Sequence, residues 1–412
     1  MQIAYTPEQE AMRQELRAYF AELMTPEVLD EVAAGESGGP HCLEAVRQLG
    51  RDGWLGLGWP VEYGGRGLGD VEQFIFSDEA WRAGAPIPFL TINTVGKTIM
   101  DFGSEGQKDF FLPKILAGEL HFSIGYTEPN AGTDLASLRT TAVRDGDEWV
   151  INGQKIYTSL ASYADYIWLA ARTDPEAPKH KGISIFLVPT SAPGFSYTKI
   201  HTMVNASTFT TYYDDVRVPD SAIVYAVNRG WDLIVNQLNY ERVSLAPPGM
   251  LSRVFDETVA WARETKLPDG RRVIDQEWAR VNLARVKAKL EYLQLINWKV
   301  AASASVANGQ RASVANGQPA SVANGQPGAN PADASTCKVY GTELSTEAYR
   351  LLSEVVGPAA TLARCSPGAV LAGRIERGAQ GCLILTFGGG TNEIQRDLIA
   401  LFGLGLPRVP RS

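Results

Sequence analysis

The start of the chain carries apolar residues at helical spacing. They recur every three or four positions, at Met12, Leu16, Phe20 and Leu23. Residues 6–9, with the sequence Thr-Pro-Glu-Gln, combine a capping threonine with proline at the first helical position and glutamine three residues after the cap. This pattern predicts an amphipathic helix. Similar stretches at 42–51 and 107–117 indicate that the chain is mainly helical up to residue 120.

The pattern changes after residue 120. Short runs rich in aromatic and β-branched residues follow at 148–155, 163–172, 182–190 and 211–219. Asp-Gly, Asn-Gly and proline bound these runs, which is typical of an antiparallel sheet. Helical periodicity then returns from Trp231 to Gly403. We therefore predict an α+β fold with an N-terminal α-helical domain (1–120), a middle antiparallel β domain (121–222) and a C-terminal α-helical domain (223–412).

One segment departs from this plan. The sequence Ser-Val-Ala-Asn-Gly-Gln occurs at 305–310, 313–318 and 321–326. Its small and polar residues offer too little apolar surface to offset the entropy that ordering would cost. A solenoid would need a longer repeat with core residues of its own. The sequence therefore predicts an exposed low-complexity loop over 305–330, within a connection between two helices.

Composition narrows the class of protein. Of the 412 residues, 45% are hydrophobic and 20% are charged, which is typical of globular proteins in solution. No run approaches the roughly 18 apolar residues of a membrane span, and the N-terminal sequence lacks the layout of a secretory signal, so we expect a cytoplasmic protein without membrane contact. The net charge of −8 argues against a nucleic-acid partner, which would favour a basic surface.

Cysteine and histidine spacing indicates neither a metal site nor a disulfide framework. The four cysteines are Cys42, Cys337, Cys365 and Cys382, and the four histidines are His41, His121, His180 and His201. Neither set has the close spacing of metal ligands, so no metal is predicted. The sequence also has no G-x-G-x-x-G after a predicted strand and no Walker lysine, so a Rossmann or P-loop nucleotide site has no support.

A carboxylate falls on the apolar face of the helix predicted at 231–246. Ile234, Leu238 and Leu245 form an apolar stripe, and Glu241 lies on the same stripe. Most glutamates on helices are solvated, which is the ordinary interpretation of such a residue. A carboxylate on the core side is costly to ionise, so its pKa rises unless it is paired, and such a group can act as a general base. Arg242 lies on a different face of the helix.

Three loops offer contacts for a ligand. Residues 125–134, Gly-Tyr-Thr-Glu-Pro-Asn-Ala-Gly-Thr-Asp, open the β segment with hydroxyl groups and with a glycine, Gly132, that allows close backbone approach. Residues 152–162 offer Tyr157 as an aromatic wall beside hydroxyl groups. Three consecutive glycines, 388–390, precede a predicted helix that Thr391 or Asn392 can cap. These loops are consistent either with ordinary turns or with the binding of a polar ligand, which at the helix N-terminus would be anionic or phosphorylated.

Taken together, these segments resemble the acyl-CoA dehydrogenase family. The order of helices, a β segment opening on Tyr-Thr-Glu-Pro-Asn-Ala-Gly-Thr-Asp, and helices closing on Gly-Gly-Gly-Thr-Asn-Glu-Ile-Gln-Arg is similar to that family, as are residues 58–65 and 102–119. The resemblance covers essentially the whole chain except 305–330. It implies that FAD lies between the β domain and the C-terminal helices, with acyl-CoA on the other face of the flavin.

The resemblance also implies which residues contact cofactor and substrate. The positions that match the family's flavin contacts are Ile124, Tyr126, Thr127, Gly132, Thr133, Tyr157, Ser159 and Thr391. Among them, Thr127 matches a hydrogen-bond donor to the flavin. Thr133 and Arg242 match substrate contacts.

The reaction that the resemblance implies is α,β-dehydrogenation. A carboxylate removes the pro-R α-proton while a hydride leaves the β-carbon for flavin N5, which gives a trans-2-enoyl-CoA. Many members carry this glutamate at the position of Gly389, whereas a minority, including isovaleryl-CoA dehydrogenases, carry it at the position of Glu241. This chain resembles the minority. Gly389 then clears space beside the thioester, and its N–H polarises the acyl carbonyl as part of an oxyanion hole.

Two segments depart from the family's pattern. An Arg-x-x-Phe-Gly segment, which reaches the flavin of a neighbouring subunit, would fall near 262–272, where Phe-Gly is missing. A Gln-x-x-Gly-Gly turn with the same role is replaced by 354–358. Since the segments for the chain's own flavin survive, the chain is similar to subunits of bacterial α2β2 acyl-CoA dehydrogenases that shorten steroid side chains. This implies a related partner subunit, a steroid or other bulky acyl-CoA with a short side chain, and an electron-transfer flavoprotein or other electron acceptor.

Two other interpretations stay open. One is a self-sufficient homotetramer that acts on a short branched acyl-CoA. The other is a non-catalytic scaffold subunit that only retains the fold, and the presence of Glu241 and of the 125–134 segment argues against it. Bound flavin would colour an enzyme, whereas a scaffold would stay colourless.

Overall fold

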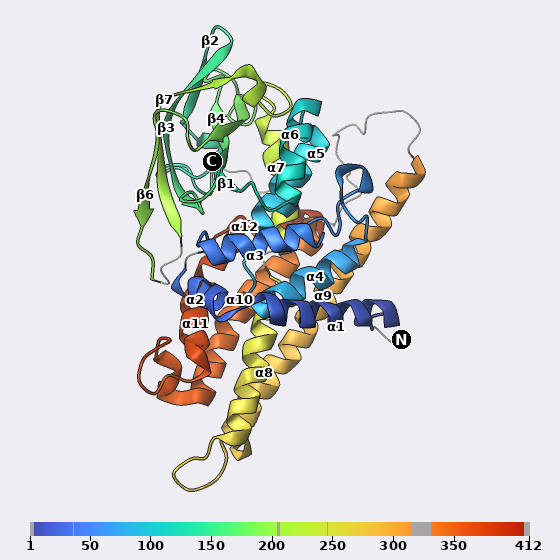
Figure 1. Ribbon diagram of the computed structural model, residues 1–412, viewed down its shortest axis with the longest axis vertical. Helices are drawn as coiled ribbons and strands as arrows, with labels where there is room; N and C mark the ends of the chain where they lie inside the picture. The colour runs from blue at the N-terminus through green and yellow to red at the C-terminus, as the bar shows by residue number, and fades with distance from the viewer. Residues whose placement is uncertain (1–3, 36, 204–206, 245, 315–330, 408–412) are drawn as a thin grey trace. The chain divides into compact units, whose positions relative to one another are not determined.

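The computed structural model describes residues 4–35, 37–203, 207–244, 246–314 and 331–407, without the side chains of 238–244 and 303–314. Its contacts divide the chain into two compact units. The helical unit comprises 1–23, 68–85 and 242–412, and the sheet unit comprises 24–67 and 86–241. Helices, a sheet and further helices follow one another along the chain, so the predicted α+β fold is confirmed (Figure 1).

The helical unit packs long helices from distant parts of the sequence. Its α-helices are α1 (Pro7–Leu23), α4 (Asp70–Ala83), α8 (Gly249–Glu264), α9 (Glu277–Val314), α10 (Pro331–Val356), α11 (Arg374–Gly381) and α12 (Asn392–Phe402). Helix α1 begins with the predicted capping box, since Thr6 N donates to Gln9 Oε1 (3.1 Å) and Gln9 N donates to Thr6 Oγ1 (3.2 Å). The predicted apolar face of α1 is buried at Leu16 and Phe20.

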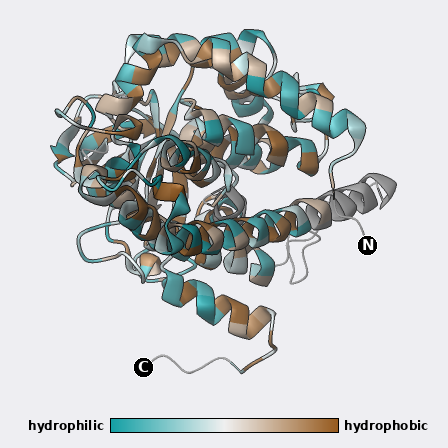
Figure 2. Cartoon of the chain, turned by 90° about the horizontal axis from the view of Figure 1, so that it is seen from below, coloured by the Kyte–Doolittle hydropathy of each residue, from teal (hydrophilic) through white to brown (hydrophobic). Residues whose placement is uncertain are grey.

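Hydrophobic and hydrophilic residues are mixed along the ribbon of the chain (Figure 2). Helix α10 packs against α9 and α12 around buried side chains that include Leu293, Leu344 and Leu352. Helix α8 begins directly against α4, because a Cβ atom at Gly249 would lie only 2.0 Å from the carbonyl oxygen of Asp78. Glycine at this position therefore allows the two helices to meet.

The sheet unit combines short helices with one sheet. Its helices are α2 (Pro26–Ala34), α3 (Pro40–Arg51), α5 (Lys97–Phe102), α6 (Glu105–Leu116) and most of α7 (Gly230–Ser244). The strands are β1 (Phe122–Gly125), β2 (Thr141–Asp145), β3 (Glu148–Ser159), β4 (Tyr166–Arg172), β5 (Ile183–Pro189), β6 (Phe195–Ile200) and β7 (Thr208–Pro219). The core of the sheet contains fully buried Ile167, Leu169 and Phe186.

The sheet is largely but not entirely antiparallel. Its strands follow the order β1-β4-β2-β3-β7-β6, and β5 pairs with β4. The antiparallel prediction is correct for β2–β3, β3–β7, β6–β7 and β4–β5, but β1 and β2 run parallel to β4. The physical reason is the long connection, because strands separated by an intervening hairpin can return to the sheet in the same direction.

The repeat segment begins differently from the prediction. Helix α9 continues through Val314, so the backbone of the first repeat copy, 305–310, is helical where the sequence predicts a loop. An established helix needs no new nucleus to add residues, and alanine has the highest helix propensity, which favours this extension. The rest of the predicted loop, 315–330, lies outside the described residues.

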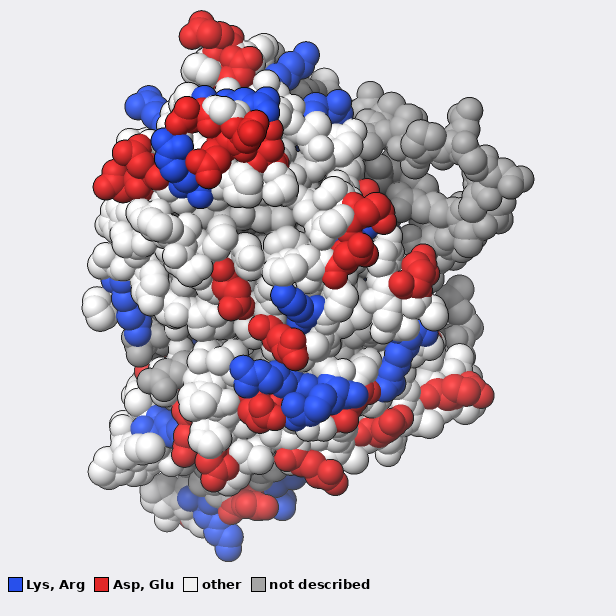
Figure 3. All heavy atoms as spheres, turned by 45° about the horizontal axis from the view of Figure 1, so that its top comes forward, with Lys and Arg blue, Asp and Glu red and all other residues white. Residues whose placement is uncertain are grey.

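Charged side chains are mixed on the surface. Acidic and basic groups intersperse on the face drawn in Figure 3. At the β2–β3 and β7 end of the sheet, Arg217 pairs with Asp145 (2.9 Å) and Glu148 (3.2 Å). Within the described part of the chain, none of the helices is both long enough and apolar enough to cross a bilayer.

Candidate active site

The loop after β1 is held by its backbone and by Tyr126. The carbonyl oxygen of Thr127 accepts a hydrogen bond from Ile156 N (2.8 Å), and the Tyr126 hydroxyl accepts one from Trp168 Nε1 (2.9 Å). Tyr126 is buried, whereas Ile124 and Thr127 are partly exposed. The Thr127 hydroxyl makes no hydrogen bond to another described residue. The loop thus presents a fixed backbone with an available hydroxyl group.

Gly132 lies beside Thr127 on the same loop. A Cβ atom built at Gly132 would be 3.9 Å from Thr127 Cγ2, which is an ordinary van der Waals contact, and Gly132 does not have a positive φ. The chain itself therefore has room for a side chain at this position. Thr133, the next residue, is exposed.

Tyr157 is held in a strained conformation. Its φ is +59° and the residue is 60% exposed. The pairing of β3 with β7 shifts register between Lys155 and Thr158, so Tyr157 lies in a β-bulge. A left-handed conformation is costly for an aromatic residue, and such strain is concentrated at functional sites. Ser159, two residues later, is also exposed.

A buried ion pair lies under this loop. Lys155 Nζ donates to Glu128 Oε1 (2.8 Å) and to the carbonyl oxygen of Tyr126 (3.1 Å). Both side chains are almost fully buried. Neither residue is among the predicted ligand contacts. The alternation of β3 offered a signal for Lys155, because it lies an even number of positions after buried Trp149 and Ile151.

The glycine turn before α12 has the left-handed geometry that glycine permits. Gly389 has a φ of +67° and Gly390 a φ of +87°. The carbonyl oxygen of Gly389 accepts a hydrogen bond from Gln395 Nε2 (2.9 Å), whereas the Gly389 N–H donates to no other described residue. An N–H group fixed in this way is available to a ligand.

Polar side chains of α10 and α12 support the same turn. Lys338, which is fully buried, donates to the carbonyl oxygen of Gly390 (3.0 Å) and to Asn392 Oδ1 (2.6 Å). Thr391 caps α12, since its hydroxyl accepts from Ile394 N (3.4 Å). The predicted cap is therefore confirmed, while Lys338 was missed because no local pattern relates it to a turn some 50 residues later.

Position 241 lies within α7, on the face predicted from the sequence. It follows buried Gln237 by four residues and buried Ile234 by seven, which is the spacing of one helical face. The side chains of Glu241 and Arg242 lie outside the described residues. Their roles as base and substrate contact stay predictions.

The two segments that depart from the family pattern belong to the helical unit. Residues 265–272 form a tight turn between α8 and α9, in which Lys266 and Arg272 form a β-bridge (Figure 1). Glu354 pairs with Arg350 and accepts a hydrogen bond from Asn282 Nδ2 (2.9 Å). The negative charge that replaces the family's Gln is thus partly offset within the chain.

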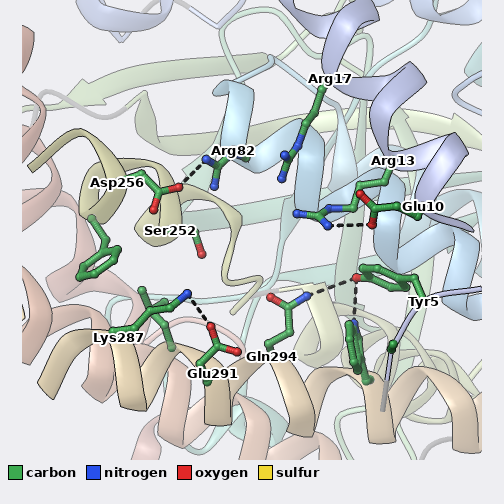
Figure 4. A pocket seen from close by; sticks show the side chains of 14 residues that line it. Tyr5, Glu10, Arg13, Arg17, Arg82, Ser252, Asp256, Lys287, Glu291 and Gln294 are labelled. Carbon is green, nitrogen blue, oxygen red and sulfur yellow. Dashed lines mark hydrogen bonds and ion pairs between the residues drawn. The ribbon is translucent and has the colours of Figure 1, made fainter. Parts of the chain in front are cut away.

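A separate cavity of about 650 Å³ lies among α1, α4, α8 and α9. Its charged side chains largely pair with one another, as Arg82 does with Asp256 (2.5 Å) and Lys287 with Glu291 (2.5 Å) (Figure 4). It contains none of the residues predicted to bind cofactor or substrate. Because ligand sites are mostly apolar with a few polar groups, we assign no chemistry to this cavity.

The chain is similar over almost its whole length to proteins of one family. Family models described as the N-terminal, middle and C-terminal domains of acyl-CoA dehydrogenase match residues 6–119, 123–216 and 228–403. Acyl-CoA dehydrogenase FadE26 of Mycobacterium tuberculosis is 57% identical over 417 residues, which is 100% of each chain.

Two solved structures have the same architecture. A chain of the ChsE4-ChsE5 complex from Mycobacterium tuberculosis matches with a TM-score of 0.89 at 57% identity, covering 99% of this chain and 100% of that one. A chain of the Tcur3481-Tcur3483 steroid ACAD matches with a TM-score of 0.89 at 48% identity and the same coverage. The chain belongs to the acyl-CoA dehydrogenase family, whose members are flavoenzymes that act on CH–CH bonds.

Proposed function

We propose that the chain is one subunit of a heteromeric, FAD-dependent acyl-CoA dehydrogenase that converts a bulky acyl-CoA with a short side chain, such as a steroid thioester, to the trans-2-enoyl-CoA. The observation that carries this proposal is the full-length similarity to a chain of the ChsE4-ChsE5 complex and to a chain of the Tcur3481-Tcur3483 steroid ACAD. The loss of Phe-Gly near 262–272 and of Gln-x-x-Gly-Gly at 354–358 supports it.

The residues present fit a flavin. Thr127 offers an available hydroxyl group, and Gly132 leaves open space that the chain's own packing does not require. Tyr157 keeps an exposed aromatic ring in a strained conformation. An aromatic wall, a hydroxyl group and an unhindered backbone suit a flat heterocycle. As further flavin contacts we propose Ile124, Tyr126, Thr133, Ser159 and Thr391. When bound, FAD would accept the hydride.

The base in this proposal is Glu241. Its position follows buried Ile234 and Gln237 on one face of α7, and the competing position is occupied by Gly389. Burial raises the pKa of a carboxyl group and brings its basicity closer to neutral pH. Removal of the α-proton leaves negative charge on the thioester oxygen, and the Gly389 N–H supplies a donor for it. Arg242 and Thr133 would hold the acyl-CoA.

The proposed partner is a related chain that retains the segments this chain has lost. In a symmetric pair of this chain, each flavin would lack the contacts that Phe-Gly and Gln-x-x-Gly-Gly supply in the family. A different subunit would supply these contacts to the flavin of this chain. The partner would not bind a second flavin, because this chain lacks the segments that would complete the partner's site. The expected stoichiometry is one FAD per two chains, with electron-transfer flavoprotein or another acceptor reoxidising it.

Expression of the chain alone and with its partner tests the assembly. Alone, the chain is expected to bind flavin poorly or aggregate, and together the two chains are expected to give a stable complex with one flavin per pair. Native mass and flavin absorbance measure both quantities. A homotetramer with one flavin per chain and full activity on a short branched acyl-CoA would contradict the heteromeric proposal, and a complex without flavin would contradict the catalytic one.

A further inference from the structure

We propose that the buried Glu128–Lys155 pair is a positioning device that fixes the Tyr126–Thr127 peptide, and with it the Thr127 hydroxyl and N–H, toward the flavin. This inference rests on the proposed cofactor site.

The geometry begins with Lys155. Its Nζ atom, which is fully buried, donates to the carbonyl oxygen of Tyr126 over 3.1 Å. The carbonyl and N–H groups of a trans peptide point in opposite directions. Because Lys155 holds the Tyr126 carbonyl on the inner side of the loop, the Thr127 N–H of the same peptide points to the other side.

The next peptide is held in the same way. The Thr127 carbonyl oxygen accepts from Ile156 N (2.8 Å), and the N–H of that peptide, on Glu128, donates to Ala131 O (3.1 Å). Both peptides that flank the Thr127 Cα atom are therefore fixed. The direction of the Thr127 side chain follows from its backbone, while its hydroxyl and N–H groups bond to no other described residue.

Glu128 anchors the lysine. Its Oε1 atom accepts from Lys155 Nζ (2.8 Å) and Thr140 N (2.8 Å), and its Oε2 atom accepts from Arg139 N (2.7 Å). Although burial opposes ionisation, the Lys155 ammonium group holds the pKa of Glu128 below its usual value. Burial lowers the pKa of Lys155 to about 8, against the attraction of Glu128. Through these hydrogen bonds the pair joins the loop to the residues before β2 and to β3.

A buried ion pair often stabilises a fold no better than apolar residues of similar volume. Stability alone therefore does not require charges here. An apolar pair would fill the same space but could not donate the hydrogen bond that Lys155 Nζ makes to the Tyr126 carbonyl oxygen. The specific requirement met by the lysine is this hydrogen bond.

The test uses the complex with its partner subunit and compares three variants. Lys155→Met with Glu128→Gln removes both charges together, so no single buried charge is left. Glu128→Gln alone keeps the lysine and is the milder change. Val216→Ala, a fully buried core residue of β7, destabilises the sheet without touching the loop.

Flavin affinity is expected to fall at least tenfold in the double variant and by a smaller factor in Glu128→Gln, with a shifted absorption band of the bound flavin. Val216→Ala is expected to keep the wild-type affinity and spectrum. In flavin-free protein, amide hydrogen exchange of 125–134 should rise at least tenfold in the double variant relative to the rest of the sheet.

Wild-type affinity, spectrum and loop exchange in both pair variants would overturn the inference, as would an equal loss of affinity in Val216→Ala. If the double variant does not fold, the inference is tested with Glu128→Gln alone, by flavin affinity, flavin spectrum and the hydrogen exchange of 125–134. A wild-type complex without flavin would contradict the proposed function instead, and the hydrogen exchange of 125–134 would still test the role of the pair.

Discussion

The ammonium group of Lys338 donates a hydrogen bond to the carbonyl oxygen of Gly390 over 3.0 Å. The same group donates to the carbonyl oxygen of Thr386 (3.2 Å), so one buried side chain ties both ends of the glycine turn. Lys338→Met would remove both hydrogen bonds, at a cost of about 1 kcal/mol for each. We expect a lower melting temperature and a turnover number reduced at least tenfold, with a smaller change in KM.

The matched control for this prediction is Lys299→Met. Lys299, on α9, pairs with Asp333 (2.8 Å) of α10, the helix that carries Lys338, and its side chain is 64% exposed. An exposed pair contributes little to stability. Steady-state kinetics of both variants at equal flavin loading separate the two outcomes, and equal activity in the two would contradict a role for Lys338 in holding the turn.

The strain at Tyr157 predicts opposite effects on stability and on binding. Tyr157→Gly relieves a φ of +59°, which is expected to stabilise the flavin-free protein by about 1 kcal/mol. The loss of the aromatic ring is expected to weaken flavin binding at least tenfold. Tyr225→Gly, at a second left-handed tyrosine with a φ of +67°, is the control and should leave flavin affinity unchanged. Flavin titration measures the affinity of both variants. Wild-type affinity in Tyr157→Gly would show that the Tyr157 ring does not contribute to flavin binding.

Gly132 offers a test of close ligand approach. Gly132→Ala meets only Thr127 Cγ2 at 3.9 Å, so its melting temperature without flavin is expected to stay within about 2 °C of wild type. Flavin affinity should fall at least tenfold because the new methyl group occupies space used by the ligand. Gly106→Ala, which meets no atom within 4 Å, should bind flavin normally. Unchanged affinity in both variants would show that Gly132 is not needed for binding.

The buried carboxyl group of Asp78 is expected to make the free energy of unfolding depend on pH. Burial, with the charge of Glu79, raises the pKa of Asp78 from 3.8 to about 7. The folded state therefore binds a proton that the unfolded state releases, so this group's contribution is fully present below about pH 4 and is lost as the pH rises through 7. The shift corresponds to an upper limit of roughly 4 kcal/mol.

Asp78→Asn removes this pH dependence and can keep an acceptor for Gly249 N–H, which bonds the Asp78 carboxylate. The melting temperature of the variant is expected to exceed that of wild type at about pH 8 and to approach it at about pH 5. Thermal unfolding across this range measures the difference. A constant difference between the two proteins would contradict the raised pKa of Asp78.

Local patterns predicted most of the elements. The capping box at Thr6 and Gln9 and the alternation that buries Trp149 and Ile151 each gave the correct type of structure. The extension of α9 through Val314 was not predicted, because propagation from an existing helix depends on the preceding residues rather than on the repeat. The grouping of α1 and α4 with the C-terminal helices also depends on long-range packing that no local pattern contains.

The candidate site was predictable where a residue acts through its type and position. Gly389 and Thr391 could be found because a positive φ and a helix cap favour few residue types. Lys155 and Lys338 could not, because their function depends on which carbonyl oxygens the fold brings to them. A lysine in a strand or a helix is ordinarily a surface residue.

Glu241 is central to the proposed reaction, and its exchange to glutamine removes the proton acceptor while keeping the shape of the side chain. The control on the same helix is Asp232→Asn, whose carboxylate pairs with Arg229 (2.7 Å) near the start of α7. Both variants are expected to keep their flavin and to bind acyl-CoA.

The deciding measurement is the anaerobic rate at which acyl-CoA bleaches the visible absorbance of the bound flavin in a single turnover. In Glu241→Gln this rate is expected to fall by roughly 10³-fold or more, while Asp232→Asn reacts at the wild-type rate. Bleaching of Glu241→Gln at a rate close to that of wild type would contradict the assignment of the base and with it the proposed mechanism.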